Sequence, residues 1–247
     1  MENKTLVLIM AAGKGARISS VLNEDEPIKP MIRYNGQRLI EHVIKSTSTL
    51  PFDKSVLSFD SPKFDSLDKL VKDNGLILLK QRANQGMPMI YVLARQYYSL
   101  HDPNYFKQFD HIMMMPSDVI LEEVDLEDFY QLHIDNLDPK FPRQVTMLCA
   151  DGKNYQSKVD FLRLEGNRVV SLKKILKNSE ENYISSYQAG IHLITKAVFE
   201  NPIEGMLKNM FGYNFNYVRV IRYATDGRWK NFGNLDDLLR YRKDGDK

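Results

Sequence analysis

The residues best suited to chemistry lie in the loop 11–17, directly after a continuous apolar run. Gly13 and Gly15 form a Gly-x-Gly pair, which lets backbone N–H groups converge on an anion without interfering Cβ atoms. Arg17 follows two residues later, and Lys29 precedes the next predicted helix. Because fixed positive charge at the ends of buried strands stabilises phosphoryl transfer, these residues indicate a site for a polyphosphate.

Two other phosphate-binding motifs do not fit this loop. A P-loop requires G-x-x-x-x-G-K-[ST], and this loop has neither the first glycine nor the serine or threonine of that motif at the required positions. The dinucleotide fingerprint requires a third glycine, and Ile18 stands in its place, which disfavours an oxidoreductase on a dinucleotide fold. A plain glycine turn is the remaining alternative, and the cations Arg17 and Lys29 weigh against it.

The elements that must position these residues follow from the hydrophobic pattern. Apolar runs predict strands at 6–10, 55–59, 76–79, 111–115, 145–150, 159–164, 169–172, 187–194 and 217–222. Helical spacing predicts helices at 38–50, 63–73, 89–100 and 235–242. Strands that alternate with helices are typical of a parallel sheet with helices on both faces, in which ligands bind beyond the carboxyl ends of the strands. We therefore expect one α/β domain over 1–247, in which 141–247 extends the sheet built by 1–140.

Composition excludes several classes of protein. The 247 residues include 34 Lys+Arg and 32 Asp+Glu, a near-balance that argues against nucleic-acid and membrane partners. Cys149 is the single cysteine, so an internal disulfide and a thiolate zinc cluster are excluded. No apolar run reaches the roughly 18 residues of a membrane span, and the start has no signal-peptide layout. We expect a cytoplasmic protein whose five histidines, which lack metal-like spacing, are structural.

The order of the motifs resembles the sugar-nucleotidyltransferase family, the nucleoside-diphosphate-sugar pyrophosphorylases and their cytidylyltransferase relatives. That family opens approximately with L-x-A-A-G-x-G-T-R-L, and this chain has I-M-A-A-G-K-G-A-R-I at 9–18. The family continues with P-K-P-L-x-P-[VI]-x-G-x-P-[LI]-[IL], and this chain has I-K-P-M-I-R-Y-N-G-Q-R-L-I at 28–40. The resemblance implies a Rossmann-like three-layer α/β/α fold of GT-A type with a mixed, mostly parallel sheet. The resemblance also implies that residues 1–140 bind the nucleotide and that residues 141–247 bind the acceptor.

The resemblance also assigns roles on the nucleotide side. It implies that Arg17 holds the triphosphate together with the glycine loop, and that Lys29 contacts phosphate near the reacting centre. Gln81 and Gly86 match a glutamine and a glycine of the family, and an amide side chain can read the edge of a base. Gln85 is a rival for that role, and a polar loop that caps a helix is the alternative. The implied nucleotide-binding residues are Ala11, Ala12, Gly13, Gly15, Gln81, Gly86 and Ser117.

Two segments resemble the family's magnesium ligands. The run M-M-M-P-S-D at 113–118 resembles a strand-end motif whose aspartate binds Mg²⁺, and a turn aspartate is the alternative reading of Asp118. The run W-K-N-F-G-N-L-D-D-L at 229–238 resembles W-x-D-[IV]-G-T-x-x-D-L, so Asn231 stands in place of the second metal-binding aspartate. Asparagine keeps an oxygen ligand and loses the charge, so the affinity for Mg²⁺ should fall. We expect Mg²⁺ as the cofactor, with Asp118 and Asn231 as its ligands.

The acceptor side shows a looser match. The segment 167–174 resembles the family's d-g-x-V-x-x-[FI]-x-E-K, and either Lys173 or Lys174 would meet the phosphate of the acceptor. A solvated basic edge is the alternative. The segment 186–192 resembles the A-G-[IV]-Y strand that lines the sugar side in the family, and it contains Gly190.

The activity that this resemblance implies is transfer of a nucleotidyl group from a nucleoside triphosphate to a phosphorylated acceptor, with a sugar 1-phosphate favoured and pyrophosphate released. Such an acceptor attacks the α-phosphorus directly, so no serine, cysteine or histidine nucleophile is needed. Asn231 and Ala16, which replaces a family hydroxyl residue, motivate a second hypothesis, a catalytically weak nucleotide-binding regulator. A cytidylyltransferase acting on a non-sugar phosphomonoester is a third. The sequence leaves the base, the acceptor and assembly into a homo-oligomer open.

Overall fold

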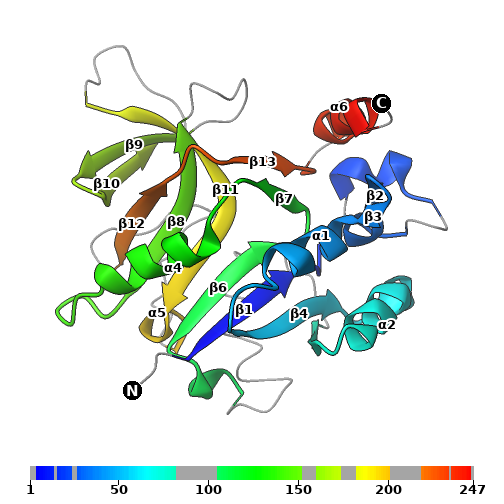
Figure 1. Ribbon diagram of the computed structural model, residues 1–247, viewed down its shortest axis with the longest axis horizontal. Coiled ribbons are helices and arrows are strands. Elements are labelled where there is room, and N and C mark those ends of the chain that lie inside the picture. Colours follow the sequence, from blue (N-terminus) through cyan, green and yellow to red (C-terminus); the bar gives the residue numbers. More distant parts are fainter. Residues whose placement is uncertain are drawn as a thin grey trace. The chain divides into compact units, whose positions relative to one another are not determined.

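The computed structural model describes residues 4–13, 16–23, 27–81, 105–151, 160–173, 182–200, 218–233 and 235–245 (Figure 1). The chain forms two compact units, each assembled from separate stretches of sequence. Unit 1 comprises Met1–Thr5, Met87–Met113 and Glu123–Arg228, and unit 2 comprises Leu6–Gly86, Met114–Glu122 and Trp229–Lys247. This division does not coincide with the predicted parts 1–140 and 141–247. The prediction that both parts belong to one domain stays a prediction. The predicted helix at 89–100 lies outside the described residues.

Parallel strands form the centre of unit 2. They are β1 (Thr5–Met10), β4 (Asp53–Phe59) and β5 (Ile77–Gln81), in the order β5-β4-β1. The side chains from Leu6 to Ile9 are fully buried, as expected for a parallel strand that is covered on both faces. Met10 pairs with Leu57 and Phe59 with Gln81, so the three carboxyl ends lie at one edge. This is the edge at which the predicted loop 11–17 begins.

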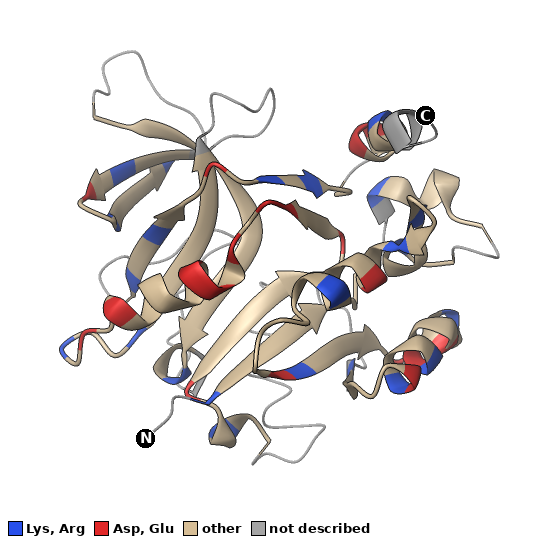
Figure 2. Cartoon of the chain, viewed as in Figure 1, with Lys and Arg blue, Asp and Glu red and all other residues tan. Residues whose placement is uncertain are grey.

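The other elements of unit 2 are short. They are the 3₁₀ helices η1 (Ala16–Val21), η2 (Lys29–Met31) and η3 (Pro62–Phe64), the strands β2 (Arg33–Tyr34), β3 (Gln37–Arg38), β7 (Val119–Glu122) and β13 (Arg228–Asn231), and the helices α1 (Leu39–Ser46), α2 (Asp65–Asp73) and α6 (Leu235–Gly245). Strand β13 pairs with β7, and β2 pairs with β3 through a turn in which Asn35 and Gly36 have positive φ. Figure 2 shows both acidic and basic residues along α2, which buries Leu67, Leu70 and Val71.

The predicted helix at 38–50 is too long. Helix α1 ends at Ser46, where three consecutive hydroxyl residues turn back onto the last helical carbonyls. Ser46 Oγ donates to Val43 O at 2.9 Å, Thr47 Oγ1 to Ile44 O at 2.9 Å, and Ser48 Oγ to Lys45 O at 2.7 Å. Serine and threonine compete in this way with the helical backbone bonds, which explains the earlier end.

Unit 1 is built mainly from antiparallel strands. They are β8 (Gln144–Asp151), β9 (Asp160–Glu165), β10 (Arg168–Lys173), β11 (Ile184–Thr195) and β12 (Arg219–Ala224), in the order β11-β8-β12-β10-β9. The pair β12–β8 is parallel, and β9 also pairs with β11. Beside them lie η4 (Phe106–Gln108), α4 (Leu126–Asp135) and α5 (Lys196–Glu200), and β6 (His111–Pro116) runs from unit 1 into unit 2. Sheet pairing is therefore mixed, as predicted.

Three histidines are buried in unit 1, as their predicted structural role requires. His133 Nδ1 lies 2.7 Å from Thr146 Oγ1, and its Nε2 lies 3.1 Å from His111 Nδ1. Burial, together with the neighbouring His111, lowers the pKa of His133 to about 3. Burial also lowers the pKa of His192 to about 4. These rings are therefore neutral in the folded chain at neutral pH.

We expect the free energy of unfolding to decrease as the pH falls from about 6.5 toward 4. The unfolded chain takes up protons on His133 and His192 near the usual value of 6.5, whereas the folded chain resists protonation down to about 3 and 4. Each ring then removes about 1.4 kcal/mol per pH unit once the pH is well below 6.5. Urea denaturation at pH 7.5, 6.0 and 5.0 measures the slope. His133→Gln should make the slope shallower, and an unchanged slope would show that His133 does not titrate in this way.

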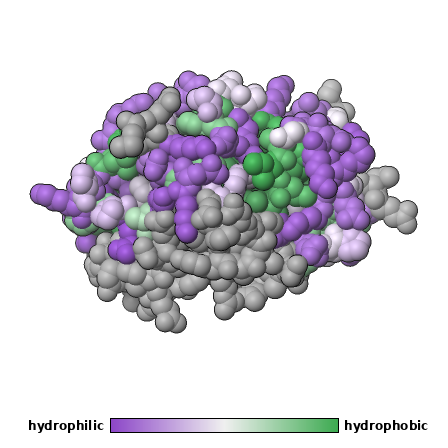
Figure 3. Space-filling view, turned by 90° about the horizontal axis from the view of Figure 1, so that it is seen from below, coloured by the Kyte–Doolittle hydropathy of each residue, from purple (hydrophilic) through white to green (hydrophobic). Residues whose placement is uncertain are grey.

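One face of the molecule is largely hydrophilic where the structure describes it (Figure 3). Figure 3 shows purple residues over most of the described part of one face, with a green apolar area beside them. The exposed large apolar side chains among the described residues belong to different segments; they are Ile77, Leu137, Phe141, Ile184 and Leu239. Single apolar side chains of this kind are ordinary on a folded protein. Within the described ranges, no helix is long and apolar enough to cross a membrane. Assembly into a homo-oligomer stays a prediction.

Candidate active site

The loop after β1 and the residues after β6 are joined by a backbone hydrogen bond. Ser117 N–H donates to Met10 O at 3.2 Å, and Ala11 N–H donates to Leu57 O at 2.8 Å. Ala11 and Ser117 are buried, Ala12 is half-buried and Gly13 is exposed. The beginning of the predicted phosphate loop therefore lies beside the segment that carries the predicted metal ligand.

The phosphate loop presents an exposed backbone and an exposed cation. A Cβ added to Gly13 would meet no atom within 4 Å among the described residues, so an anion has room to approach its backbone. Arg17 lies in the first turn of η1 and is exposed. Gly15 lies outside the described residues.

Lys29 and Asp118 form an ion pair, although they are 89 residues apart in sequence. Lys29 begins η2, whose Pro30 sets the helical backbone at its start. Asp118 directly follows Ser117 and precedes β7. Each side chain is 16% exposed, so the pair is more strongly coupled than a pair in bulk water. The structure thus brings together a predicted catalytic lysine and a predicted metal ligand.

One hydrophobic cluster adjoins four of the predicted phosphate and metal residues, which are Arg17, Lys29, Asp118 and Asn231. Its buried members are Ile18, Ile32, Tyr34, Leu39, Ile120, Phe232 and Leu238. Ile18 follows Arg17, and Ile32 lies three residues after Lys29. Ile120 lies two residues after Asp118, and Phe232 follows Asn231. Burying each large apolar side chain contributes about 1.5–3 kcal/mol, so the cluster fixes four distant segments against one another.

Asn231 lies next to Asp118, and its buried side-chain oxygen has no donor among the described residues. Phe232 N–H donates to Asp118 O at 2.9 Å, which holds the end of β13 at the start of β7. The side-chain Oδ1 of Asn231 is buried and accepts no hydrogen bond from the residues that the structure describes. A Cβ at Gly233 would lie 2.8 Å from that oxygen, so the glycine leaves it room. A buried acceptor without a donor costs about 1–3 kcal/mol, which a bound cation would offset.

The donors at this position fit a small hard cation. Asp118 offers a carboxylate and Asn231 an amide oxygen, and both are the oxygen ligands that Mg²⁺ prefers. In the part of the chain that the structure describes, no three His, Cys, Asp or Glu side chains gather into a metal-binding group. The candidate site therefore has one carboxylate and one amide, with Lys29 supplying a further positive charge.

The structure describes only some of the remaining predicted site residues. Gln81 ends β5 at the edge of the parallel strands, while its side chain, Gly86 and Lys174 lie outside the described residues. In unit 1, Lys173 ends β10 with Nζ 5.0 Å from the centre of the Tyr183 ring. Gly190 has φ +75° where the register of β11 and β8 shifts, a conformation that favours glycine. The acceptor-binding roles of these residues stay predictions.

Sequence reasoning missed a second charged group near Asn231. Lys230 Nζ donates to Glu122 Oε1 at 2.5 Å and to Tyr34 OH at 2.9 Å. Burial alone would lower the pKa of Lys230, but its hydrogen bonds to Glu122 and Tyr34 raise that pKa above the usual value. Tyr34 and Lys230 are 196 residues apart, and no spacing in the sequence connects them.

Known proteins resemble this chain in structure. No family model matches the sequence, and no curated protein matches it. The inositol-1-phosphate CTP transferase from T. maritima is 15% identical with a TM-score of 0.63, over 96% of this chain and 94% of that one. A putative glucose-1-phosphate thymidylyltransferase from Bacillus anthracis is 16% identical with a TM-score of 0.67, over 98% and 95%. The CMP:2-keto-3-deoxy-manno-octonic acid synthetase complexed with CTP is 16% identical with a TM-score of 0.65, over 98% of each chain.

These similarities cover nearly the whole chain and define its fold. The chain has the Rossmann-like α/β fold of these nucleotidyltransferases, which confirms the predicted fold class. The α/β alternation and the mixed sheet pairing described above agree with it.

Proposed function

We propose that this chain transfers a nucleotidyl group from a nucleoside triphosphate to a phosphorylated acceptor. The observation that carries the proposal is the hydrophobic cluster of unit 2, which holds the segments of Arg17, Lys29, Asp118 and Asn231 together. These residues come from four separate parts of the sequence, and their types suit a triphosphate and its cation. Structures of the same fold are named as a CTP transferase and a thymidylyltransferase, which supports this reaction class.

The reaction requires positioning and charge neutralisation rather than a protein nucleophile. An oxygen of the acceptor phosphate attacks the α-phosphorus, and the bond from that phosphorus to the bridging oxygen of the β-phosphate breaks. Pyrophosphate leaves with the electron pair, and no proton needs to move because the acceptor phosphate is largely dianionic at neutral pH. Arg17 and the backbone around Gly13 would hold the triphosphate, and Lys29 would neutralise charge near the reacting phosphorus.

Asp118 and Asn231 would hold Mg²⁺ through one carboxylate and one amide oxygen. When bound there, the ion would add positive charge against the phosphate oxygens that become more negative in the transition state. Lys29 would then exchange its contact with Asp118 for a contact with phosphate. Since Asn231 contributes no charge, we expect a weaker affinity for Mg²⁺ than a pair of carboxylates would give.

The acceptor that we propose is a sugar 1-phosphate, bound on the side of Lys173, Lys174 and Gly190. A cytidylyl transfer to a non-sugar phosphomonoester uses the same attack and is the nearest alternative. A regulator that binds nucleotide without turnover is favoured by one observation, the missing charge at Asn231.

Pyrophosphate release tests the proposal. ATP, GTP, CTP, UTP and dTTP are each incubated with Mg²⁺ and a panel of sugar 1-phosphates and other phosphomonoesters. We expect release with at least one pair. If the protein clearly binds a nucleotide but no pair of triphosphate and acceptor gives pyrophosphate, the enzymatic function is overturned in favour of the nucleotide-binding regulator.

Gly13→Ala tests the phosphate loop without disturbing the fold. The new Cβ meets no described atom within 4 Å, so the melting temperature should stay unchanged. The methyl group would enter the space left for an anion, and we expect the affinity for the triphosphate to fall about tenfold. Calorimetric titration with the triphosphate measures this. Ser20→Ala, at an exposed position of η1, is the control. Wild-type affinity in Gly13→Ala would exclude this loop as the phosphate site.

A further inference from the structure

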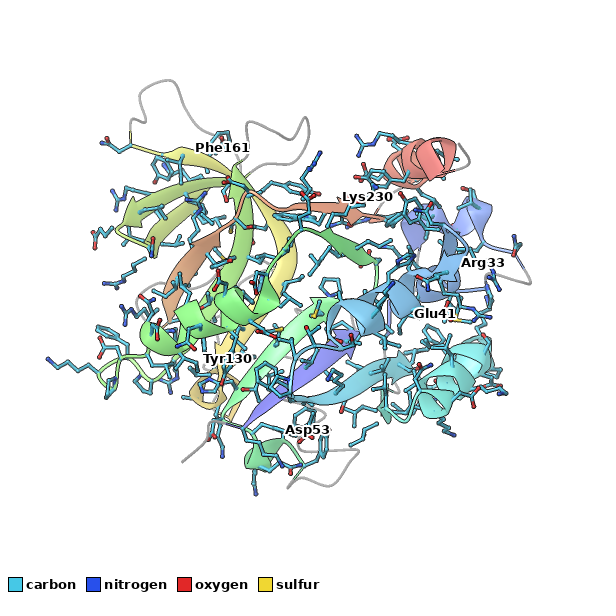
Figure 4. The ribbon with its side chains drawn as sticks, viewed as in Figure 1. Arg33, Glu41, Asp53, Tyr130, Phe161 and Lys230 are labelled. Carbon is cyan, nitrogen blue, oxygen red and sulfur yellow. The ribbon has the colours of Figure 1, made fainter. Side chains whose placement is uncertain are left out.

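Lys230, which is labelled in Figure 4, contacts polar and aromatic side chains of unit 2. Its ammonium donates to Glu122 Oε1 at 2.5 Å and to Tyr34 OH at 2.9 Å. The same nitrogen lies 5.2 Å from the centre of the Tyr34 ring and 6.0 Å from that of Tyr241. Its side chain is only 25% exposed, so these contacts are shielded from water more than those of a surface ion pair.

The contacts of Lys230 join β7 and β13, the two short strands at whose ends the proposed metal ligands lie. Asp118 precedes β7 and Glu122 ends it, while Lys230 and Asn231 are the last two residues of β13. Figure 2 shows basic residues on β13 and acidic residues at the end of β7. The pair of strands is tied by Phe232 N–H to Asp118 O near one end of β7 and by Lys230 to Glu122 at the other.

The side chain of Lys230 points away from the proposed site. Neighbouring side chains in a strand lie on opposite faces, so Lys230 and Asn231 point in opposite directions. Phe232, two residues after Lys230, packs 5.2 Å from Tyr34 and 5.0 Å from Tyr241, centre to centre, on the rings that also surround the ammonium. Lys230 therefore reaches the metal ligands only through the backbone of β13.

We propose that Lys230 is a positioning residue, which holds β13 against β7 and Tyr34 and so keeps Asn231 in place beside Asp118. The inference rests on the proposed function for what Asn231 binds. The network itself concerns only residues of unit 2. Without the ammonium, Glu122 and Tyr34 have no common partner on β13, and the end of β13 gains freedom to move. The expected loss is in the affinity for the metal rather than in the affinity for the nucleotide.

Lys230→Met tests this inference, because methionine keeps the length and apolar stem and removes the charge. In the presence of a non-hydrolysable triphosphate analogue, we expect the dissociation constant for Mn²⁺ to rise about tenfold, with the nucleotide affinity at saturating Mn²⁺ nearly unchanged. Glu122→Gln should act in the same direction, and Lys230→Arg should restore part of the affinity. Arg228→Met is the matched control, since that exposed side chain on the same strand pairs only loosely with Glu123 at 3.7 Å.

Hydrogen exchange provides a second readout that needs no metal. The amide of Phe232 donates to Asp118 O, and we expect its protection to fall about tenfold in Lys230→Met and to stay unchanged in Arg228→Met. Unchanged Mn²⁺ affinity and unchanged protection in Lys230→Met would overturn this inference and leave the proposed function standing. A fall in melting temperature without a change in Mn²⁺ affinity would also overturn it, since the role would then be merely structural. Failure of the wild-type protein to bind Mn²⁺ with any triphosphate would instead overturn the proposed function.

Discussion

Replacing Lys29 with methionine is expected to abolish most pyrophosphate release and to increase the affinity of the nucleotide-free protein for Mg²⁺. Turnover should fall about 100-fold or more, because a cation near the reacting phosphorus is lost. The affinity for Mg²⁺ should rise about tenfold, because the ammonium no longer competes for the Asp118 carboxylate with which it pairs. Calorimetric titration with Mg²⁺ and the release assay measure the two effects, which have opposite signs.

Two variants show whether the opposite signs come from this ion pair. Asp118→Asn should lower both the turnover and the affinity for Mg²⁺. Lys45→Met, at an exposed position of α1, should change neither. An unchanged or lower affinity for Mg²⁺ in Lys29→Met would show that Lys29 and the cation do not compete. If they do compete, a triphosphate that draws Lys29 away from Asp118 must strengthen the binding of Mg²⁺, and the reverse coupling must be equally large.

Replacing Asn231 with aspartate is expected to raise the affinity for Mg²⁺ about tenfold or more, and to raise turnover where Mg²⁺ is limiting. The buried Oδ1 of Asn231 has no donor in the described part of the chain, so a negative charge there competes with no described hydrogen bond and adds a charged ligand. In the absence of the cation the same change brings a second carboxylate close to Asp118. The melting temperature of the variant should therefore be lower than that of the wild type in EDTA and should rise more steeply with Mg²⁺.

Asn167→Asp is the matched control for Asn231→Asp. It adds the same charge at an exposed turn of unit 1 and should alter neither the affinity for Mg²⁺ nor the turnover. Equal behaviour of the two variants would show that Asn231 is not a ligand and would leave Asp118 as the only proposed one. An increase in affinity without an increase in turnover would favour the nucleotide-binding regulator.

Long apolar runs predicted the strands well, because burial on both faces leaves a continuous pattern in the sequence. Leu6 to Ile9 in β1 and Val145 to Ala150 in β8 are examples. Gly75 follows α2 with φ +68°, a conformation that favours glycine. Helix α4 was missed, although Asp125 caps it by accepting hydrogen bonds from the Glu127 and Asp128 amides. Strands β7 and β13 were missed because four residues are too few to show a period.

The sequence by itself determined which residue types stand after which predicted strands, and its resemblance to the sugar-nucleotidyltransferase family predicted Arg17, Lys29, Asp118 and Asn231 as one site. Types and spacings are local properties, and the strand-end positions follow from them. Only the tertiary structure decided which of these side chains meet. The pairing of Lys29 with Asp118 and the hydrogen bonds of Lys230 to Glu122 and Tyr34 join residues that are 89 to 196 positions apart, and the Oδ1 of Asn231 has no donor among the described residues. Such contacts arise from the packing of the cluster around Ile18, Tyr34 and Phe232, and packing between distant segments leaves no period in a single sequence.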